Sequence, residues 1–463
     1  MSAPLFELWT RTVGRDPGAL ALVDAATGKR WSRAALLRES LAWARAAGGR
    51  AVLGRRRVAM TVPNGAEWFQ VFLGLLASGA VPVPIDPSEP PAAQLAAARA
   101  VGASFLWSGG GLAPVARAMG SRRARVGANE ALVKLTSGSS GAPKALAVTH
   151  GQLAADGRHI CASMGIASAD ISLGAIPLGY SYGLGNLVAP LLLQGSPVLC
   201  TANALPHGIA AEIARHAPTV FPAVPPLLRA LVESDVEPAS MASLRLVISA
   251  GSPLAPEVAA AFEAKFGMRV HGFYGTSETG GIAFDRTGEA TLEGRSVGTP
   301  LQGVRLTPAR GGRLRVSSRA VVGRGSFLPA DRCRVDARGE VVLLGRSDRV
   351  VKIAGRRVDL AEIEAALRLV PGVAGAYVHL PPAPRSTLAA AVATHLTAPE
   401  VRGHLRSRLA PWKLPGRILS LAAFPCTPRG KTDTAALRQL LEAPRIETSI
   451  STFSAARQMS ARR

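Results

Sequence analysis

Leu135-Thr-Ser-Gly-Ser-Ser-Gly-Ala-Pro-Lys144 is the stretch of this sequence that most restricts the possible folds. Glycines and small hydroxyl residues in series let backbone N–H groups and hydroxyls converge on an anion, and Lys144 adds positive charge at the end. The spacing differs from that of the GxxxxGK[ST] loop. Because the apolar run 131–135 precedes the stretch and Pro143 comes just before its final lysine, we interpret it as an anion-binding loop that follows a strand, rather than as a flexible linker.

Around this loop the sequence alternates between short apolar runs and helical stretches. Residues 58–62 are a strand-like run, after which Asn64 is placed to cap a helix that Gly79 ends. The run 244–250 ends in Gly251-Ser-Pro, the kind of strand end where open sheets bind ligands. We therefore predict an α/β fold with a large, multi-layer N-terminal domain that contains parallel-rich sheets.

Later in the chain the sequence changes to short segments punctuated by glycine, which are typical of strands. From Val350 onward the order strand, helix, strand, helix predicts a small α+β C-terminal domain. We place the boundary near Arg346–Arg349, between an N-terminal domain at 1–346 and a C-terminal domain at 349–440. The basic tail 441–463 is low in apolar residues, so we expect it to be disordered.

Several segments, in the same order along the chain, resemble motifs of the adenylate-forming (AMP-binding) superfamily of acyl-CoA synthetases and acyl-AMP ligases. Residues 136–144 resemble its phosphate loop, T-S-G-[ST]-[ST]-G-x-P-K. Ser249-Ala-Gly-Ser-Pro-Leu254 is similar to its adenine-edge segment, and Gly272-Phe-Tyr-Gly-Thr-Ser-Glu278 to its Y-G-x-T-E motif. Gly345-Arg-Ser-Asp348 resembles the hinge, and Pro428-Arg-Gly-Lys431 resembles the segment that carries the catalytic lysine.

The resemblance implies a role for each residue that matches a motif. Lys431 would bridge the acyl carboxylate and the α-phosphate of ATP, Lys144 would face the β- and γ-phosphates, and Glu278 would be both catalytic and the Mg²⁺ ligand. Positive charge suits the anionic transition state of this reaction. Tyr274 would stack on adenine and Asp331 would bind the ribose hydroxyls. The expected nucleotide-binding residues are Thr136, Ser137, Gly138, Ser139, Ser140, Gly141, Ala250, Gly251, Ser252, Tyr274, Gly275, Ser277, Asp331 and Arg346.

The same resemblance implies an acyl pocket and a thiol path. The expected acyl-pocket residues are Tyr180, Tyr182, Phe221, His271 and Thr276. Tyr180 stands where the family often has histidine, and a tyrosine still offers a flat wall with a polar tip. In this family the small domain rotates before a thiol attacks the adenylate, which implies Asp348 as the hinge residue and Gly355 beside the approach of the thiol.

Two motifs depart from the pattern of the family. Ser277 replaces a threonine but keeps a hydroxyl, whereas Pro329-Ala-Asp331 stands in place of T-G-D. The second change keeps the carboxylate and alters the residues of the turn before it. The effect on ribose binding is therefore an open question at the level of the sequence.

The resemblance implies an acid–thiol ligase. We expect ATP-dependent activation of a fatty or aryl carboxylic acid to an acyl-adenylate, with release of pyrophosphate, followed by transfer to coenzyme A. ATP, Mg²⁺ and coenzyme A, or the phosphopantetheine of a carrier protein, are the expected cofactors. Two alternatives stay open: an acyl-AMP ligase that loads a separate acyl carrier protein, and a catalytically degenerate basic binding protein. The sequence indicates neither the particular acid nor the oligomeric state.

The charge composition bears on the possible partners. The chain carries 54 lysines and arginines against 31 acidic residues, a formal net charge of +23, which taken alone suggests a polyanion. Only seven of these residues are lysine and 47 are arginine, as expected from a compositional bias. Lysines 144, 352, 413 and 431 lie within segments that resemble motifs of the family. We therefore expect the phosphates of ATP, not a nucleic acid, to be the anionic partner.

Hydropathy and cysteine usage complete these expectations. No apolar run approaches the roughly 20 residues that a membrane-spanning helix needs, and the first residues lack the basic and apolar regions of a signal peptide. We therefore expect no stable membrane insertion and a cytoplasmic location. Cys161, Cys200, Cys333 and Cys426 are widely scattered, which predicts reduced thiols rather than disulfides or a metal site.

Overall fold

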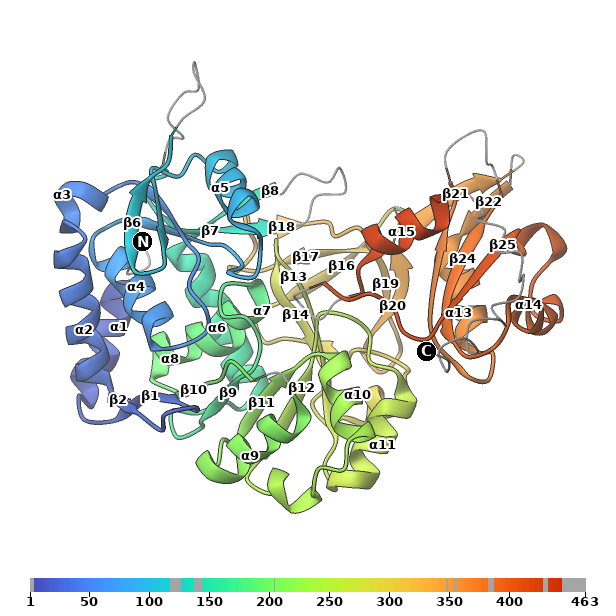
Figure 1. Cartoon of the computed structure of the whole chain (residues 1–463), viewed down its shortest axis with the longest axis horizontal. Coiled ribbons are helices and arrows are strands. Elements are labelled where there is room, and N and C mark those ends of the chain that lie inside the picture. Colours follow the sequence, from blue (N-terminus) through green and yellow to red (C-terminus); the bar gives the residue numbers. More distant parts are fainter. Residues whose placement is uncertain are drawn as a thin grey trace, which may run out of the picture. The chain divides into compact units, whose positions relative to one another are not determined.

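The computed structural model describes residues 4–116, 126–136, 144–203, 205–346, 349–353, 356–381, 387–427 and 432–443. The chain divides into two compact units, the first made of residues 1–347 and 427–431 and the second of residues 348–426 and 432–463. In Figure 1 the colours follow the chain from blue at the start of the first unit to red at the end of the second.

The first unit contains a mixed sheet with nine described strands in the order β15-β14-β13-β12-β11-β9-β10-β1-β2. Neighbouring strands from β13 to β1 are parallel, and β14, β15 and β2 pair antiparallel at the two edges. The bounds are β1 (Leu20–Asp24), β2 (Arg30–Ser32), β9 (Ser172–Gly174), β10 (Val198–Cys200), β11 (Val220–Ala223), β12 (Leu246–Ser249), β13 (Val270–Thr276), β14 (Gly280–Phe284) and β15 (Thr299–Pro300). This sheet confirms the predicted α/β fold with parallel-rich sheets.

Helices cover both faces of this sheet, as parallel strands require. Alternate residues of β12 belong to different cores: Val247 packs with α9, α10 and α11, whereas Ile248 packs with Ile160 of α6. The helices of this part are α6 (His150–Met164), α7 (Ser181–Gly183), η1 (Leu184–Val188), α8 (Ala189–Gln194), α9 (Pro206–His216), α10 (Pro225–Glu233), η2 (Pro238–Met241), α11 (Pro256–Phe266) and α12 (Glu289–Leu292).

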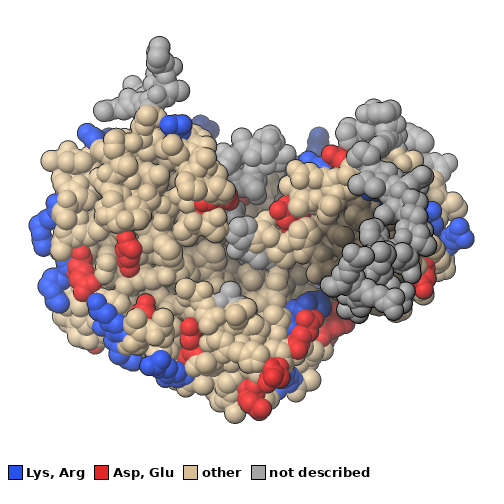
Figure 2. Space-filling model, in the orientation of Figure 1, with Lys and Arg blue, Asp and Glu red and all other residues tan. Residues whose placement is uncertain are grey.

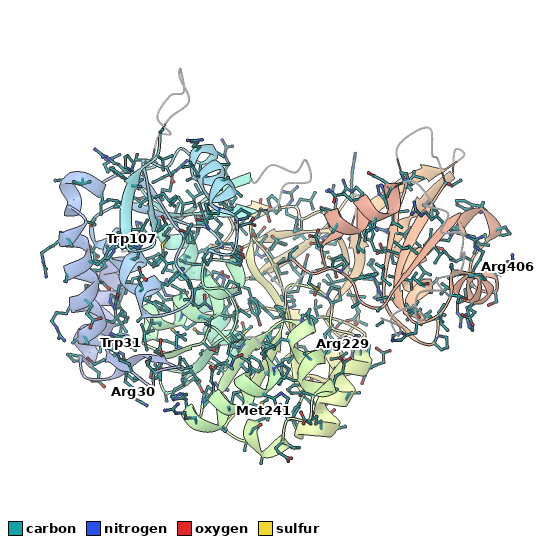
Figure 3. The ribbon with its side chains drawn as sticks, in the orientation of Figure 1. Arg30, Trp31, Trp107, Arg229, Met241 and Arg406 are labelled. Atoms are coloured by element: carbon teal, nitrogen blue, oxygen red, sulfur yellow. The ribbon has the colours of Figure 1, made fainter. Side chains whose placement is uncertain are left out.

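Smaller sheets complete the first unit. One has the order β4-β3-β5-β6, another is the hairpin β7-β8, and the third has the order β16-β17-β19-β20 with β18 paired to β17. Trp107 of β5, which is labelled in Figure 3, packs edge to face against Trp43 of α2, with ring centroids 5.0 Å apart. The bounds are α1 (Leu5–Arg15), α2 (Arg33–Ala46), α3 (Gly49–Leu53), β3 (Arg57–Met60), α4 (Ala66–Ala77), β4 (Val81–Pro84), α5 (Pro91–Ala100), β5 (Phe105–Ser108), β6 (Gly111–Pro114), β7 (Glu130–Thr136), β8 (Lys144–Thr149), β16 (Arg305–Ala309), β17 (Arg313–Ser317), β18 (Ser326–Phe327), β19 (Asp331–Val335) and β20 (Val341–Arg346).

The structure corrects the role that the sequence suggested for Asn64. The N-cap of α4 is Gly65, and no side chain caps this helix. The Asn64 amide instead donates to the carbonyl oxygens of Gly174 and Ile176, and its oxygen accepts from the Leu178 N–H. Asn64 therefore ties the start of α4 to the loop after β9. The predicted end of the helix at Gly79 is confirmed, because Gly79 adopts a φ of +68° and its N–H bonds to Leu76.

The second unit has its own apolar core. Ile363 and Leu367 of α13 pack with Val378 and Val392 of the sheet and with Leu405 of α14. The sheet has the order β23-β24-β25, and β21 and β22 form a separate hairpin. The bounds are β21 (Val350–Ile353), β22 (Arg356–Asp359), α13 (Leu360–Arg368), β23 (Val373–His379), β24 (Ala389–Thr394), α14 (Ala398–Arg406), η4 (Pro411–Lys413), β25 (Arg417–Leu421) and α15 (Thr434–Glu442).

The surface of the first unit mixes charges of both signs. On the face in Figure 2, blue basic groups along the lower left edge alternate with red acidic groups instead of forming one continuous patch. None of the described helices is long and apolar enough to cross a membrane. All four cysteines are free, and Cys161, Cys200 and Cys333 are buried.

Candidate active site

The hairpin of β7 and β8 carries the glycine- and serine-rich loop. The two strands pair antiparallel with Thr136 opposite Lys144, so the ends of the loop are neighbours across the hairpin. The base of the hairpin is fixed by Glu130, which accepts two bonds from the Arg57 guanidinium at 2.7 and 3.2 Å. Residues Ser137, Gly138, Ser139, Ser140 and Gly141 lie outside the described residues, as do the side chains of Thr136 and Lys144. Their expected contacts with phosphates stay a prediction.

A second hairpin, made of β13 and β14, carries Tyr274, Gly275 and Thr276, with Ser277 and Glu278 in its turn. The turn is held from several sides. The Thr276 and Thr279 hydroxyls lie 3.1 Å apart, the Ser181 hydroxyl donates to Ser277 Oγ at 3.1 Å, and the Val322 N–H donates to the Glu278 carbonyl at 2.8 Å. Gly275 lies so close to Gly280 that an added Cβ would be 2.6 Å from the Gly280 carbonyl oxygen. This position therefore requires glycine.

The structure brings together Tyr274 and Asp331, two residues assigned to the nucleotide. The Tyr274 hydroxyl donates to Asp331 Oδ2 at 2.7 Å. Burial and the nearby Asp331 carboxylate raise the pKa of Tyr274, and burial raises the pKa of Cys333 beside them to about 11. Asp331 also pairs across β19 and β20 with Arg346, whose side chain is not described. The unusual residues Pro329 and Ala330 thus precede an aspartate that lies beside Tyr274, where a ribose-binding carboxylate is expected.

The adenine-edge segment begins where β12 ends. Ala250 is buried, Gly251 is exposed with a φ of +93°, and Ser252 is partly buried. Because β12 and β13 run parallel with Ser249 opposite Gly272, this segment starts next to the strand that carries Tyr274. The carboxyl ends of parallel strands are where open α/β sheets bind their ligands.

On the acyl side, two tyrosines are fixed by hydrogen bonds. The Tyr180 hydroxyl donates to Asp86 Oδ2 at 2.6 Å. The Tyr182 hydroxyl donates to the Ile248 carbonyl at 3.2 Å, and its ring lies 5.9 Å from that of Phe273. Tyr182 and Phe273 thus share the core on the α6 side of the sheet.

The structure corrects the expectation for Phe221. Phe221 is fully buried in the core that α9, α10 and α11 cover. It pairs with Val247, and Val247 pairs with Val270, whereas His271 pairs with Ile248 on the opposite face of the sheet. Side chains alternate between the two faces of a strand, so Phe221 does not join Tyr182 and His271 in one wall. It packs the interior of the unit.

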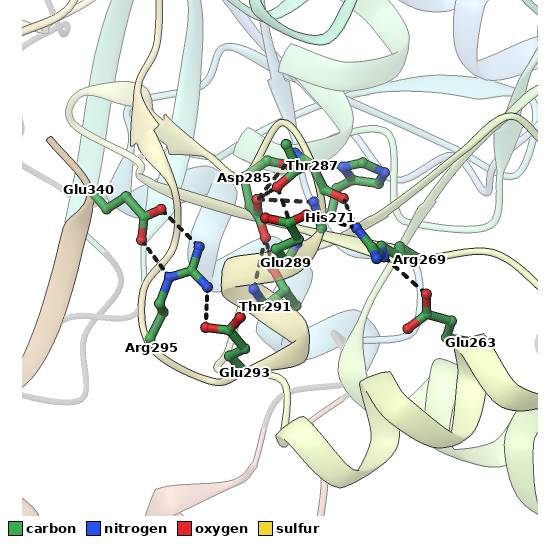
Figure 4. A network of polar contacts seen from close by, with 11 residues as sticks. Glu263, Arg269, His271, Asp285, Thr287, Glu289, Thr291, Glu293, Arg295 and Glu340 are labelled. Carbon is green, nitrogen blue, oxygen red and sulfur yellow. Dashed lines mark hydrogen bonds and ion pairs between the residues drawn. The ribbon is translucent and has the colours of Figure 1, made fainter. Parts of the chain in front are cut away.

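His271 belongs to a polar network that holds the base of the β13–β14 hairpin (Figure 4). Its Nδ1 lies 2.8 Å from the Asp285 carbonyl oxygen. The buried Asp285 carboxylate accepts bonds from the Gly288 N–H at 3.0 Å, and from the Thr291 N–H and hydroxyl at 2.8 Å each. Thr291 Oγ1 in turn accepts from the Gly272 N–H at 2.8 Å. In this network His271 has a structural contact, and its role in binding an acid stays a prediction.

Three other expected residues belong to the segments near and beyond the unit boundary. Asp348, Gly355 and Lys431 all lie outside the described residues. Their assignment as hinge, thiol-side glycine and catalytic lysine therefore rests on the sequence alone.

Two buried charges beside Glu278 were missed by the sequence reasoning. Lys134 of β7 is 5% exposed and Asp156 of α6 is 3% exposed. Burial lowers the pKa of Lys134, while the charges of Asp156 and Glu278 oppose that change. Burial raises the pKa of Asp156, opposed by Lys134 and by a hydrogen bond from the Gly281 N–H. The available signal was a lysine inside an apolar strand of a chain with only seven lysines.

The donor set fits a magnesium ion that is bound together with phosphates. Among the described residues no group of three His, Cys, Asp or Glu side chains could hold a metal by itself. Mg²⁺ prefers oxygen ligands, keeps several waters and is usually bound by one or two carboxylates plus substrate phosphates. Glu278, a single carboxylate on the hairpin next to the strand that leads into the loop, is suited to that arrangement.

Comparisons with known proteins agree with this fold, which is that of an adenylate-forming enzyme. The model of the AMP-binding enzyme family matches residues 9–124 and 118–307, and that of the AMP-binding enzyme C-terminal domain matches 362–431. The chain therefore belongs to the AMP-binding enzyme family.

Its relatives include a benzoate–CoA ligase from Thauera aromatica, 28% identical over 65% of this chain and 64% of that protein. A 2-hydroxy-7-methoxy-5-methyl-1-naphthoate–CoA ligase from Streptomyces carzinostaticus is 29% identical over 68% of this chain and 63% of that protein. An L-proline–[L-prolyl-carrier protein] ligase from Streptomyces coelicolor is 29% identical over 64% of each chain. The chain thus spans less than two thirds of the length of these relatives.

Among solved structures, ATP-bound MatB from Rhodopseudomonas palustris has a TM-score of 0.80 at 24% identity, covering 95% of this chain and 99% of that chain. A benzoate CoA ligase from Burkholderia xenovorans has a TM-score of 0.78 at 22% identity, covering 94% of this chain and all of that chain. At these identities the similarity establishes the shared fold.

Proposed function

We propose that this protein uses ATP to activate an apolar carboxylic acid, of the fatty or aryl class, and transfers the acyl group to coenzyme A. The observation that carries the proposal is the proximity of three parts of the first unit. The strand leading into the anion-binding loop lies beside Glu278, and the hairpin of Glu278 also carries the Tyr274–Asp331 pair. The residues to which we assign the phosphates, the metal and the ribose thus belong to neighbouring segments, which supports the proposal.

The acid and the acceptor are inferred from the comparisons. Relatives named as benzoate– and naphthoate–CoA ligases support an aryl acid and coenzyme A. A relative named as a prolyl-carrier protein ligase keeps a carrier-protein thiol as the competing acceptor.

In the first step a carboxylate oxygen attacks the α-phosphorus of ATP, and the bond from that phosphorus to the pyrophosphate oxygen breaks. Lys144 and the hydroxyl-rich loop bind the β- and γ-phosphates, and Lys431 bridges the carboxylate and the α-phosphate. Bound Mg²⁺ would neutralise phosphate charge and help pyrophosphate to leave. Asp331, bonded to Tyr274, holds the ribose hydroxyls so that the α-phosphate is correctly placed.

In the second step a thiolate attacks the acyl carbon of the adenylate, and AMP leaves with the electrons of the broken C–O bond. The C-terminal domain would rotate about Asp348 before this step and bring Gly355 to the thiol. Lys431 belongs to the first step alone in this scheme, so its loss should spare transfer from a supplied adenylate.

The test is pyrophosphate release by the purified protein with ATP, Mg²⁺ and a panel of fatty and aryl acids, with and without coenzyme A. We expect release that depends on the acid, and an acyl-CoA product when coenzyme A is present. An adenylate that never yields a CoA thioester would favour a carrier-protein acceptor. No acid-dependent release from any member of the panel would contradict the proposal.

Lys431→Ala should abolish adenylate formation and leave ATP binding within about twofold. The matched control is Lys29→Ala, because Lys29 is an exposed lysine whose ammonium lies 4.5 Å from the Trp31 ring centroid. Normal turnover by the Lys431 variant would refute the assignment of the catalytic lysine.

A further inference from the structure

Lys134 and Asp156 are two buried residues of opposite charge in the neighbourhood of Glu278. Lys134 extends from β7, two residues before Thr136, and Asp156 extends from the middle of α6. Both side chains are more than nine-tenths buried. Among the described residues no carboxylate lies within 4.0 Å of the Lys134 ammonium. Its charge therefore acts on Asp156 and Glu278 through space.

Asp156 is in direct contact with the strand that follows this turn. Its Oδ1 accepts a hydrogen bond from the Gly281 N–H at 2.9 Å. A Cβ added to Gly280 would lie only 2.3 Å from the same oxygen, and one added to Gly185 would lie 3.2 Å from Oδ2. The carboxylate is thus enclosed by backbone, and glycine at position 280 is what allows its close approach.

The two charges depend on each other. An ion that is buried without a partner is strongly destabilising, and removing one member of a buried pair leaves the other uncompensated. Lys134 supports the ionised form of Asp156, as do the Gly281 N–H and the nearby His159. The charge of Asp156 strengthens its bond to Gly281, because hydrogen bonds to an ionised acceptor are stronger than neutral ones.

From this geometry we propose that Lys134 and Asp156 are positioning residues for Glu278. Asp156 fixes the backbone three residues after Glu278, and the buried Lys134 places a positive charge near both carboxylates. The Glu278 carboxylate would thereby meet the Mg²⁺–nucleotide in one orientation, because residues that surround a metal-binding side chain commonly fix its orientation. The inference rests on the proposed role of Glu278 and adds two residues that act through it.

The test compares Asp156→Ala, Asp156→Asn, Lys134→Met and the double variant Lys134→Met/Asp156→Asn. Asparagine keeps an oxygen for the Gly281 N–H, and methionine keeps the length of the lysine stem. Asp170→Asn is the matched control, because Asp170 is also a buried acid of the same unit, 6% exposed against 3% for Asp156, and it pairs with Arg245 instead. Two readouts are independent of turnover. The first is hydrogen exchange of the 277–284 peptide, and the second is binding of Mn²⁺ together with a non-hydrolysable ATP analogue, measured by electron paramagnetic resonance.

We expect Asp156→Ala to accelerate exchange of the peptide and to weaken Mn²⁺–nucleotide binding about tenfold, with the KM for the carboxylic acid within twofold of wild type. Asp156→Asn and Lys134→Met should each weaken binding about threefold. The double variant should lose less than the product of the two single effects, because it leaves no unpaired charge. Asp170→Asn should leave both readouts unchanged even where it lowers stability.

Glu278→Gln separates the two levels of the argument. If Glu278→Gln leaves Mn²⁺–nucleotide binding unchanged, the assigned role of Glu278 fails, while exchange of the peptide still reports whether Asp156 holds the turn. If Glu278→Gln weakens binding and both Asp156→Asn and Lys134→Met bind and exchange as wild type, the positioning role is overturned. These two conservative variants carry that decision if Asp156→Ala does not fold.

Discussion

Replacing Asp285 by alanine should be among the most destabilising single changes in the first unit. The carboxylate is 3% exposed and accepts three bonds of 3.0 Å or less, from the Gly288 N–H and from the N–H and hydroxyl of Thr291. A bond to a charged acceptor contributes about 1.5–3 kcal/mol, and each buried donor left unpaired costs about 1–3 kcal/mol. Since bonds of one network do not add independently, we expect a loss of about 3–5 kcal/mol, a range reached by broken buried networks.

Urea unfolding followed by tryptophan fluorescence measures this loss. Five of the six tryptophans, Trp9, Trp31, Trp43, Trp68 and Trp107, belong to the first unit, so the signal reports mainly on that unit even if the second unfolds separately. Asp285→Asn keeps one acceptor oxygen and should lose about half as much. Activity should fall with stability because the network anchors the hairpin of Tyr274 and Glu278.

Asp336→Ala is the matched control for this experiment. Asp336 also accepts two backbone N–H bonds, from Arg338 and Glu340 at 2.9 Å each, but it is partly exposed. Water can replace those bonds, so Asp336→Ala should destabilise the protein much less than Asp285→Ala does. If Asp285→Ala unfolds at the same urea concentration as Asp336→Ala, burial does not determine how much the network contributes to the free energy of unfolding, and the reasoning is refuted.

Three further changes probe other parts of the first unit. Tyr274→Phe removes the 2.7 Å bond to Asp331 but keeps the ring; steady-state kinetics should give an ATP KM raised about tenfold, as for one lost bond to a charged group, and an unchanged KM would contradict a role in holding Asp331. Gly280→Ala should lower the free energy of unfolding by about 1–2 kcal/mol because of its φ of +69°, and further because the new Cβ would clash with Asp156. In the control Gly339→Ala the φ is similar, but nothing lies within 4 Å of the added Cβ. Equal melting temperatures of the two variants would argue against the clash. Burial acts to raise the pKa of Asp170, but bonds from Arg245, Ala167 and Thr219 outweigh it, and the pKa is lowered overall. The stabilisation is therefore complete above the ordinary carboxyl pKa near 3.9 and is lost as pH falls through the lower folded value. Acid unfolding of wild type should accordingly be steeper below about pH 4 than that of Asp170→Asn.

The fold was largely predictable because its elements carry local signals. The alternation of apolar runs and helices predicts the parallel sheet, and a glycine at position 79 predicts the end of α4. Asn64 shows where local signals fail. Its residue type suits a helix cap, but partners more than a hundred positions away in the sequence take up its amide, and such long-range competition leaves no mark in the adjacent residues.

The candidate site could be predicted where its residues belong to motifs. It could not be predicted where the register of a strand determines on which face of the sheet a side chain lies. The pairing of Tyr274 with Asp331 agrees with two separate motifs. Phe221 was assigned to the acyl pocket as an apolar residue, yet its register places it on the other face of the sheet. Lys134 and Asp156 belong to no motif and lie 22 positions apart on a strand and a helix, so that packing alone brings them together.

The hydrogen bond from the Ser181 hydroxyl to Ser277 Oγ has a consequence for enzyme engineering. Ser181 lies between the two tyrosines assigned to the acid, and Ser277 is the neighbour of Glu278. Libraries that redesign residues 180–182 to accept a new acid will therefore also perturb the residues assigned to the nucleotide. The effects of these substitutions on acid preference and on ATP binding will then depend on one another. Selections that hold ATP at saturating concentration will conceal this effect, whereas screening at limiting ATP will recover variants that change acid preference alone.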